Sequence, residues 1–191
     1  MGPLFNCLGG SVGAWRVTKL DTRCGPPLPD VTHIDIVNGP AGLDAGSAAS
    51  EATWILRGVV SNTRYVTRDE RALLESRQPP LGRAEATCAA LIPLKKSAAW
   101  WSLAQDERRD ILEAQSKHIA TGLLYLPAVA RRLQHSRDLG ETFDFLTWFE
   151  FAAGDAAAFE ELLRALRASE EWRFVERECD IRLVRDQDAI R

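Results

Sequence analysis

The chain has 191 residues, 46% of them hydrophobic, which suits one large domain or two small halves around a sizeable core. Its formal net charge is −3 and acids and bases are interspersed, so the sequence offers no general attraction to nucleic acid. No segment approaches the roughly 20 apolar residues of a membrane-spanning helix, and the N-terminus lacks the cationic start of a signal peptide. The four cysteines show no metal-ligand spacing. We expect a cytoplasmic protein without nucleic-acid or membrane partners.

The N-terminal quarter predicts two short strands, at residues 14–21 and 33–37, with the turn-rich sequence CGPPLPD between them. Residues 38–52 are rich in Gly, Ala and Ser, a composition typical of a mobile surface loop. This quarter carries no predicted chemistry.

A strand–helix–strand unit follows. Residues 53–66 alternate between apolar and polar side chains, which predicts a strand. Thr67 and Glu70 form a capping-box pattern for a helix that runs to about Gln78, where two prolines end it. The apolar residues 86–96 predict the next strand.

The same order returns after a helix that carries His118. Residues 143–152 predict a strand, Asp155 is a candidate helix cap, and residues 173–185 predict the closing strand. Between the last two, apolar residues recur at helical spacing: Phe159, Leu162, Leu163 and Leu166. The sequence therefore predicts an α+β fold of two ferredoxin-like halves, 1–100 and 101–191, whose antiparallel sheets curl into one barrel.

His118 has small neighbours on its helical face, because Ala114 and Gly122 lie four residues to either side. A flat ligand could approach the imidazole there, as on a haem-binding helix. Haem iron held by one histidine keeps its opposite face open, and the guanidinium of Arg131 could hold an anion on that face. From the residues alone, a core histidine and a surface arginine are the commoner roles.

Five features in one order resemble the chlorite dismutase family. They are LIPLKKSAAWW (Leu91–Trp101), His118, Arg131, FDFLTWFEF (Phe143–Phe151) and SEEW (Ser169–Trp172). The resemblance runs from about Trp54 to Arg185 and is greatest to the short-subunit branch, which forms dimers. It implies a dimeric α+β barrel and a homodimer.

The resemblance also implies roles for individual residues. His118 would be the proximal ligand of the haem iron, Glu171 would accept the second ring N–H of that histidine, and Arg131 would be the catalytic cation on the distal side. Further haem and pocket contacts implied by the family are Lys96, Trp100, Tyr65 and Asn62, with Leu133, Thr147, Phe149 and Gln78 on the distal side.

The activity implied by the resemblance is conversion of chlorite to chloride and dioxygen, with formation of an O–O bond, on one haem b per subunit. A related alternative is a coproheme decarboxylase, which lacks the distal arginine and uses a tyrosine; Tyr65 and Tyr125 are the only tyrosines here. The non-enzymatic alternative is a haem-binding protein or sensor that catalyses no reaction.

Overall fold

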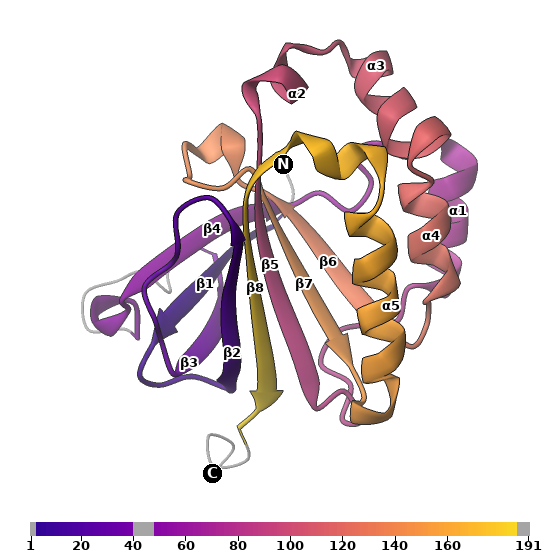
Figure 1. The fold of residues 1–191 in the computed structure, drawn as a ribbon. Coiled ribbons are helices and arrows are strands. Elements are labelled where there is room, and N and C mark those ends of the chain that lie inside the picture. The colour runs from indigo at the N-terminus through magenta and orange to yellow at the C-terminus, as the bar shows by residue number, and fades with distance from the viewer. Residues whose placement is uncertain (1–2, 40–47, 187–191) are drawn as a thin grey trace.

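The computed structural model describes residues 3–39 and 48–186, and the strands in these ranges close into a barrel (Figure 1). Around the barrel the order is β1-β3-β2-β8-β5-β7-β6-β4, and every neighbouring pair is antiparallel. The strands are β1 (Leu4–Gly10), β2 (Trp15–Cys24), β3 (His33–Asn38), β4 (Trp54–Val60), β5 (Cys88–Lys96), β6 (Ala130–His135), β7 (Phe145–Phe151) and β8 (Val175–Arg185). The predicted α+β barrel is confirmed.

The α-helices are α1 (Arg68–Arg77), α2 (Ala98–Ser102), α3 (Gln105–Arg109), α4 (His118–Leu124) and α5 (Ala156–Arg167). A π-helical turn, Asp110–Gln115, follows α3 and leads to α4. Short 3-10 turns include Ala48–Glu51 and Glu170–Phe174. In Figure 1, α1, α4 and α5 lie together on one side of the barrel, beside β6 and β7. No helix within the described ranges is long and apolar enough to cross a membrane.

The order β8-β5-β7-β6, with α5 between β7 and β8 in the chain, is the ferredoxin-like pattern. Strand β5 hydrogen-bonds to β7 and β8, so pairing groups it with the second half, whereas the division at residue 100 assigned it to the first. Strands β1 to β4 form the other half.

Helix α1 begins as the sequence predicts. The Thr67 hydroxyl accepts the backbone N–H of Glu70 at 3.3 Å, and the Glu70 carboxylate accepts the backbone N–H of Thr67 at 2.7 Å. Both donors would otherwise be unsatisfied at the helix start. The helix ends at Arg77, and its C-cap residue Gln78 stands directly before the two prolines.

Helix α5 buries the four apolar residues that its spacing predicted, Phe159, Leu162, Leu163 and Leu166. The Phe159 ring lies 4.5 Å from that of Phe151 and 5.1 Å from that of Phe149, both on β7. Asp155 occupies the N-cap position, but its side chain makes no capping bond. The helix is therefore held by its apolar face rather than by its cap.

Three elements depart from the predictions. Strand β1 was not predicted, because LFNCLGG shows no clear alternation and three of its seven residues are Asn or Gly. Strand β4 ends at Val60 rather than at residue 66, since a turn follows at 62–65. Of the predicted loop 38–52, residues 40–47 lie outside the described residues, and Ala48–Glu51 forms a 3-10 turn.

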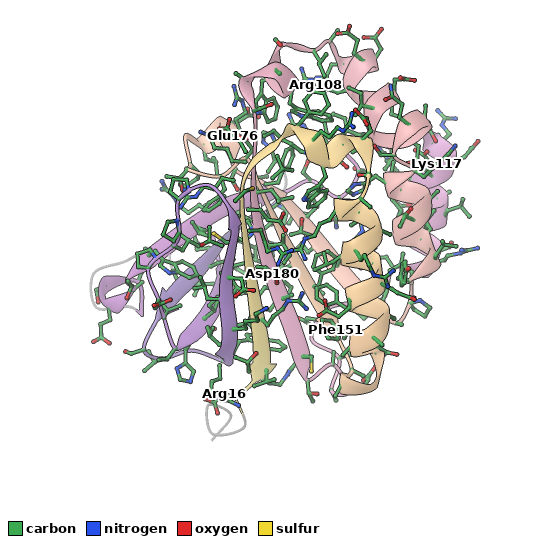
Figure 2. The ribbon with its side chains drawn as sticks, in the orientation of Figure 1. Arg16, Arg108, Lys117, Phe151, Glu176 and Asp180 are labelled. Atoms are coloured by element: carbon green, nitrogen blue, oxygen red, sulfur yellow. The ribbon has the colours of Figure 1, made fainter. Side chains whose placement is uncertain are left out.

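A buried ion network joins α5 to β8. Asp180 on β8 (Figure 2) is 4% exposed and accepts hydrogen bonds from Arg167 of α5 at 2.8 Å and from Arg182. Burial alone would raise the pKa of Asp180, but the hydrogen bonds from the two arginines outweigh it and hold that pKa below its ordinary value. The ionised carboxylate therefore contributes to stability.

Replacing Asp180 with Asn should lower the free energy of unfolding at pH 7 by on the order of 2 kcal/mol, because two partly buried guanidinium groups lose a charged partner. Since the folded pKa is depressed, this contribution is present above the unfolded pKa of about 3.9 and fades as the pH falls through the lower folded value. Urea unfolding at several pH values measures both effects.

The matched control is Glu161→Gln, which removes an exposed carboxylate 3.7 Å from Arg164. This variant should differ from the parent by less than about 0.5 kcal/mol. Equal losses in the two variants, or a loss in Asp180→Asn that persists undiminished in acid, would contradict the assignment.

Candidate functional site

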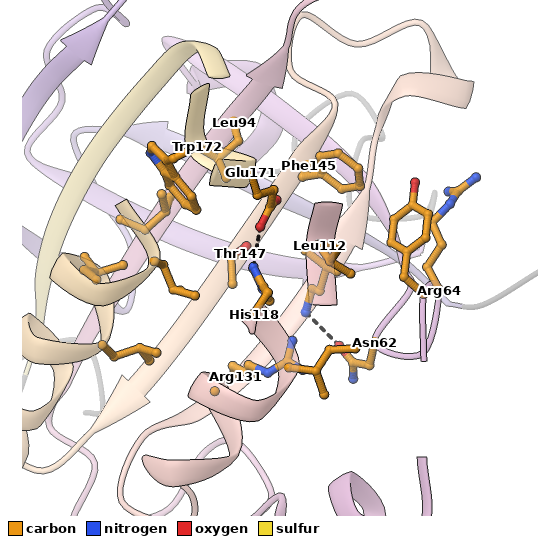
Figure 3. Close-up of a pocket in the computed structure, with 18 of the residues that line it drawn as sticks. Asn62, Arg64, Leu94, Leu112, His118, Arg131, Phe145, Thr147, Glu171 and Trp172 are labelled. Atoms are coloured by element: carbon orange, nitrogen blue, oxygen red, sulfur yellow. Dashed lines mark hydrogen bonds and ion pairs between the residues drawn. The ribbon is translucent and has the colours of Figure 1, made fainter. Parts of the chain in front are cut away.

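A cavity of about 980 Å³, including its mouth, lies among β5–β7, α4, α5 and the segment 62–66 (Figure 3). Most of the residues selected from the sequence line it: Asn62, Tyr65, Lys96, Trp100, His118, Arg131, Leu133, Thr147, Phe149 and Glu171. Gln78 does not belong to the lining; its amide donates to the backbone carbonyl of Arg131 at 2.9 Å. Gln78 thus contacts the backbone of the strand that carries Arg131.

Strand alternation brings four of these side chains onto one wall. Arg131 and Leu133 are two residues apart on β6, so they face the same side. They stand opposite Phe149 and Thr147 of β7 in the strand register. The intervening Arg132 faces the other way, with its guanidinium 3.7 Å from the centre of the Phe5 ring.

His118, Glu171 and Lys96 form one hydrogen-bonded chain. His118 Nδ1 lies 2.6 Å from Glu171 Oε2, and Lys96 Nζ donates to Glu171 Oε1 at 2.8 Å (Figure 3 draws the first bond). The Glu171 and Lys96 side chains are only 6% and 2% exposed. The carboxylate therefore meets both partners in surroundings that water barely reaches, where hydrogen bonds to charged groups are strong.

Glu171 stays ionised in this position. Burial by itself would raise the pKa of its carboxyl, but the positive charges of His118 and Lys96 and their hydrogen bonds lower it to about 2. An ionised acceptor at Nδ1 fixes the orientation of the His118 ring and makes the ring more electron-donating. Within the described residues Nε2 has no hydrogen-bond partner, so it is the nitrogen available to a ligand.

Lys96 lines the cavity and is also held by Glu171. Its ammonium lines the cavity but is bound to the side chain and the backbone carbonyl of Glu171, and it lies 4.9 Å from the centre of the Trp100 ring. These two bonds use two of the three ammonium N–H groups, which leaves one donor for a further acceptor in the cavity. Sequence spacing gave no signal for the pairing, because 75 residues separate the two partners.

The helix around His118 differs from the prediction. Lys117 has a left-handed backbone (φ 53°) and divides the segment, so α4 begins at His118 and Ala114 lies in the preceding π-helical turn. The expected stacking of Ala114 on His118 is therefore wrong. Gly122 does line the cavity, and a Cβ atom built there would meet nothing within 4 Å.

Arg131 carries a charge that no described acidic side chain pairs with. Burial lowers the pKa of its guanidinium, which remains protonated at any ordinary pH. Leucines of α5 and Phe149 surround the same cavity and keep its dielectric low, which strengthens attraction for an anion. The arginine is a ready anion-binding group.

Two buried donors also point to a polar ligand. The indole N–H of Trp100 and the hydroxyl of Tyr65 have no hydrogen-bond partner among the described residues, although both side chains line the cavity. Asn62 uses its carbonyl oxygen to accept the Leu133 backbone N–H at 2.7 Å (dashed in Figure 3), which leaves its amide N–H groups available. Unpaired buried donors are costly unless a ligand satisfies them.

Arg64 was not selected from the sequence, although it also lines the cavity. Its described acidic partner, Asp138, is 3.7 Å away and 73% exposed, so the pair holds the guanidinium weakly. Only its position two residues after Asn62 could have drawn attention to it. No group of three or more His, Cys, Asp or Glu side chains suited to a metal ion occurs in residues 3–39 and 48–186.

Replacing Lys96 with Met should lower the free energy of unfolding at pH 7 by on the order of 3 kcal/mol, because the buried Glu171 carboxylate would lose its ammonium partner. Lys95→Met is the matched control, since the Lys95 ammonium pairs with Glu176 at 2.8 Å on the exposed surface. That variant should change stability by less than about 0.5 kcal/mol in the same urea titration. Similar losses in both would sink the account.

The sequence profile described as chlorite dismutase matches residues 44–185. A chlorite dismutase of Ideonella dechloratans is 33% identical over 124 residues, which cover 61% of this chain but only 40% of that protein. The chain thus spans about two-fifths of this curated relative.

Solved structures of chlorite dismutases are also similar to this chain. The dimeric chlorite dismutase of Nitrobacter winogradskyi is 50% identical and superposes with a TM-score of 0.86, covering 95% of this chain and 99% of that one. A variant chlorite dismutase of Candidatus Nitrospira defluvii, 20% identical with a TM-score of 0.67, covers 98% of this chain and 93% of its own and shares the fold. With the family profile matching most of its length, this chain belongs to the chlorite dismutase family.

Proposed function

We propose that this protein converts chlorite to chloride and dioxygen, using one haem b per subunit. The observation that carries the proposal is the pairing, in one cavity, of a carboxylate-bound histidine with an arginine that has no acidic partner among the described residues. The first group suits an iron ligand, and the second suits a small anion. Family membership and the 50% identity to a dimeric chlorite dismutase support this reading.

The cavity suits haem on three grounds. Its walls are mostly apolar, with leucines from α5 and aromatic residues from β7, as a flat tetrapyrrole requires. The open space beside Gly122 leaves room next to His118. The unpaired donors of Trp100 and Tyr65 would meet the haem carboxylates, with Asn62 and Arg64 close by in the lining.

When bound, haem supplies the redox chemistry of the reaction. Glu171 keeps the His118 ring fixed, with Nδ1 as donor, so Nε2 would be the nitrogen that holds the haem iron. Arg131 binds chlorite through its charge and retains the anionic chlorine species until chloride and dioxygen form. Leu133 and Phe149 exclude water from the guanidinium, so its attraction for these anions is stronger than in solution.

The alternative of coproheme decarboxylation depends on a reactive tyrosine and on a distal side without arginine. Tyr65 lines the cavity with a free hydroxyl, but Arg131 stands on the wall formed by β6 and β7. Chlorite turnover is therefore the better match. A haem sensor would bind haem with the same spectrum and release no dioxygen on addition of chlorite.

We also propose that the protein is a homodimer that works in the cytoplasm. The Nitrobacter winogradskyi structure is described as dimeric, and its length is matched almost completely by this chain. Light scattering of the haem-loaded protein measures the first property, and cell fractionation measures the second.

Arg131→Ala should lower kcat/KM for chlorite by about 10- to 100-fold, because losing a half-buried cation that binds the reacting anion costs about 1.4–2.8 kcal/mol of transition-state stabilisation. A larger share of the chlorine should leave as hypochlorite, since the group that retains it is gone. An oxygen electrode and a hypochlorite scavenger measure the two quantities. Arg57→Ala is the control, because Arg57 pairs with Glu141 at 2.6 Å outside the cavity lining. Unchanged dioxygen release and hypochlorite trapping in Arg131→Ala would refute this role.

His118→Ala should weaken haem binding and shift the Soret absorption, because the cavity would lose its nitrogen ligand. His33→Ala, whose ring bonds Asp186 at 3.0 Å on the barrel, should leave the spectrum unchanged. Identical spectra and haem affinities in parent and His118→Ala would exclude His118 as the ligand.

A further inference from the structure

The segment between α3 and α4 does not continue as one helix. After the π-helical turn Asp110–Gln115, Lys117 adopts its left-handed conformation, and α4 starts with His118 as its first residue. Such an interruption frees backbone N–H groups at the new helix start, which need acceptors. In Figure 2, Lys117 marks this break beside α4.

The Glu113 carboxylate accepts the freed donors. Its Oε2 accepts the backbone N–H of Ile119 at 2.7 Å, and its Oε1 accepts that of Ala120 at 3.2 Å. Lys117 itself contributes no side-chain cap. Glu113 thus binds the first turn of the helix that begins at His118, from five residues earlier in the chain.

Ser116 holds Glu171, the hydrogen-bond partner of His118. Its hydroxyl oxygen accepts the backbone N–H of Glu171 at 2.9 Å, across 55 residues of sequence. Residues 113–116 therefore contact the start of the His118 helix with one side chain and the backbone of Glu171 with another. His118 and Glu171, which share a 2.6 Å hydrogen bond, are therefore both held by the segment 113–116.

We propose that Glu113 and Ser116 are positioning residues that set the distance and orientation between His118 and Glu171. This inference rests on the proposed function for its use in catalysis, but the geometry concerns the chain alone. Helix α4 has seven residues, too few to be stable without contacts at its ends. Loss of the Glu113 bonds would let the first turn fray, and His118 lies in that turn.

The test uses protein without haem, with ¹⁵N-labelled histidine, in mildly alkaline buffer. The Glu171 acceptor should hold His118 in the Nδ1–H form, whereas free imidazole side chains favour Nε2–H. In Glu113→Ala the ¹⁵N shifts should move towards the free mixture, and amide exchange at Ile119 should rise roughly five- to tenfold, as expected for loss of a helix cap. Ser116→Ala should shift the ring nitrogens in the same direction.

Glu107 provides a matched control in the same segment. Its carboxylate accepts the backbone N–H of Ala104 at 2.7 Å and caps α3, and within the described residues it makes no hydrogen bond to α4. Glu107→Ala should expose the Ala104 amide and leave the His118 signals unchanged. Glu113→Gln keeps one acceptor oxygen and should restore part of the Nδ1–H population. Unchanged ring shifts in Glu113→Ala, or equal changes in Glu107→Ala, would overturn the proposal.

The haem-loaded protein gives a second readout. A weaker bond from His118 to Glu171 makes the ring a poorer electron donor, so the reduction potential should rise in Glu113→Ala and recover partly in Glu113→Gln. If the parent protein bound no haem, the proposed function would fail while the NMR result stood. If haem bound normally and neither the ring shifts nor the potential changed, only the positioning role would fail.

Discussion

The site depends on the buried Glu171 carboxylate, which needs both Lys96 and His118 as hydrogen-bond partners. Glu171 lies in the 3-10 turn before β8, Lys96 at the end of β5 and His118 at the start of α4, so one charge joins three elements distant in sequence. Burying a carboxylate without partners is strongly unfavourable, and each bond made to it limits where those elements can lie. The orientation of the histidine thus follows from electrostatics inside the protein.

The opposite wall follows from a different rule. Antiparallel pairing of β6 with β7 sets Arg131 against Phe149 and Leu133 against Thr147, and a shift by one residue would turn Arg132 to the cavity instead. Gln78 bonds the backbone carbonyl of Arg131 and holds that edge of the strand from outside the cavity. The cation is positioned by sheet register, while the imidazole is positioned by ion pairing.

Local signals in the sequence predicted most of the fold. The capping box at Thr67 and the apolar spacing of α5 depend on neighbours within one or two turns, and both were confirmed. Motif order led to the family and to the residues around the cavity. The partner of Lys96 and the break at Lys117 could not be predicted, because the first depends on packing across 75 residues and the second on a backbone conformation that lysine rarely adopts.

Gly122 lowers the stability of the helix that lines the cavity. Glycine costs a helix about 1 kcal/mol relative to alanine, and α4 is too short to absorb that loss easily. Nothing in the described chain demands it, since a methyl group there would touch no neighbour. Folding alone would favour a larger residue at this position. Glycine at this position therefore makes α4 less stable than alanine would. In return it leaves open space beside His118 for a ligand.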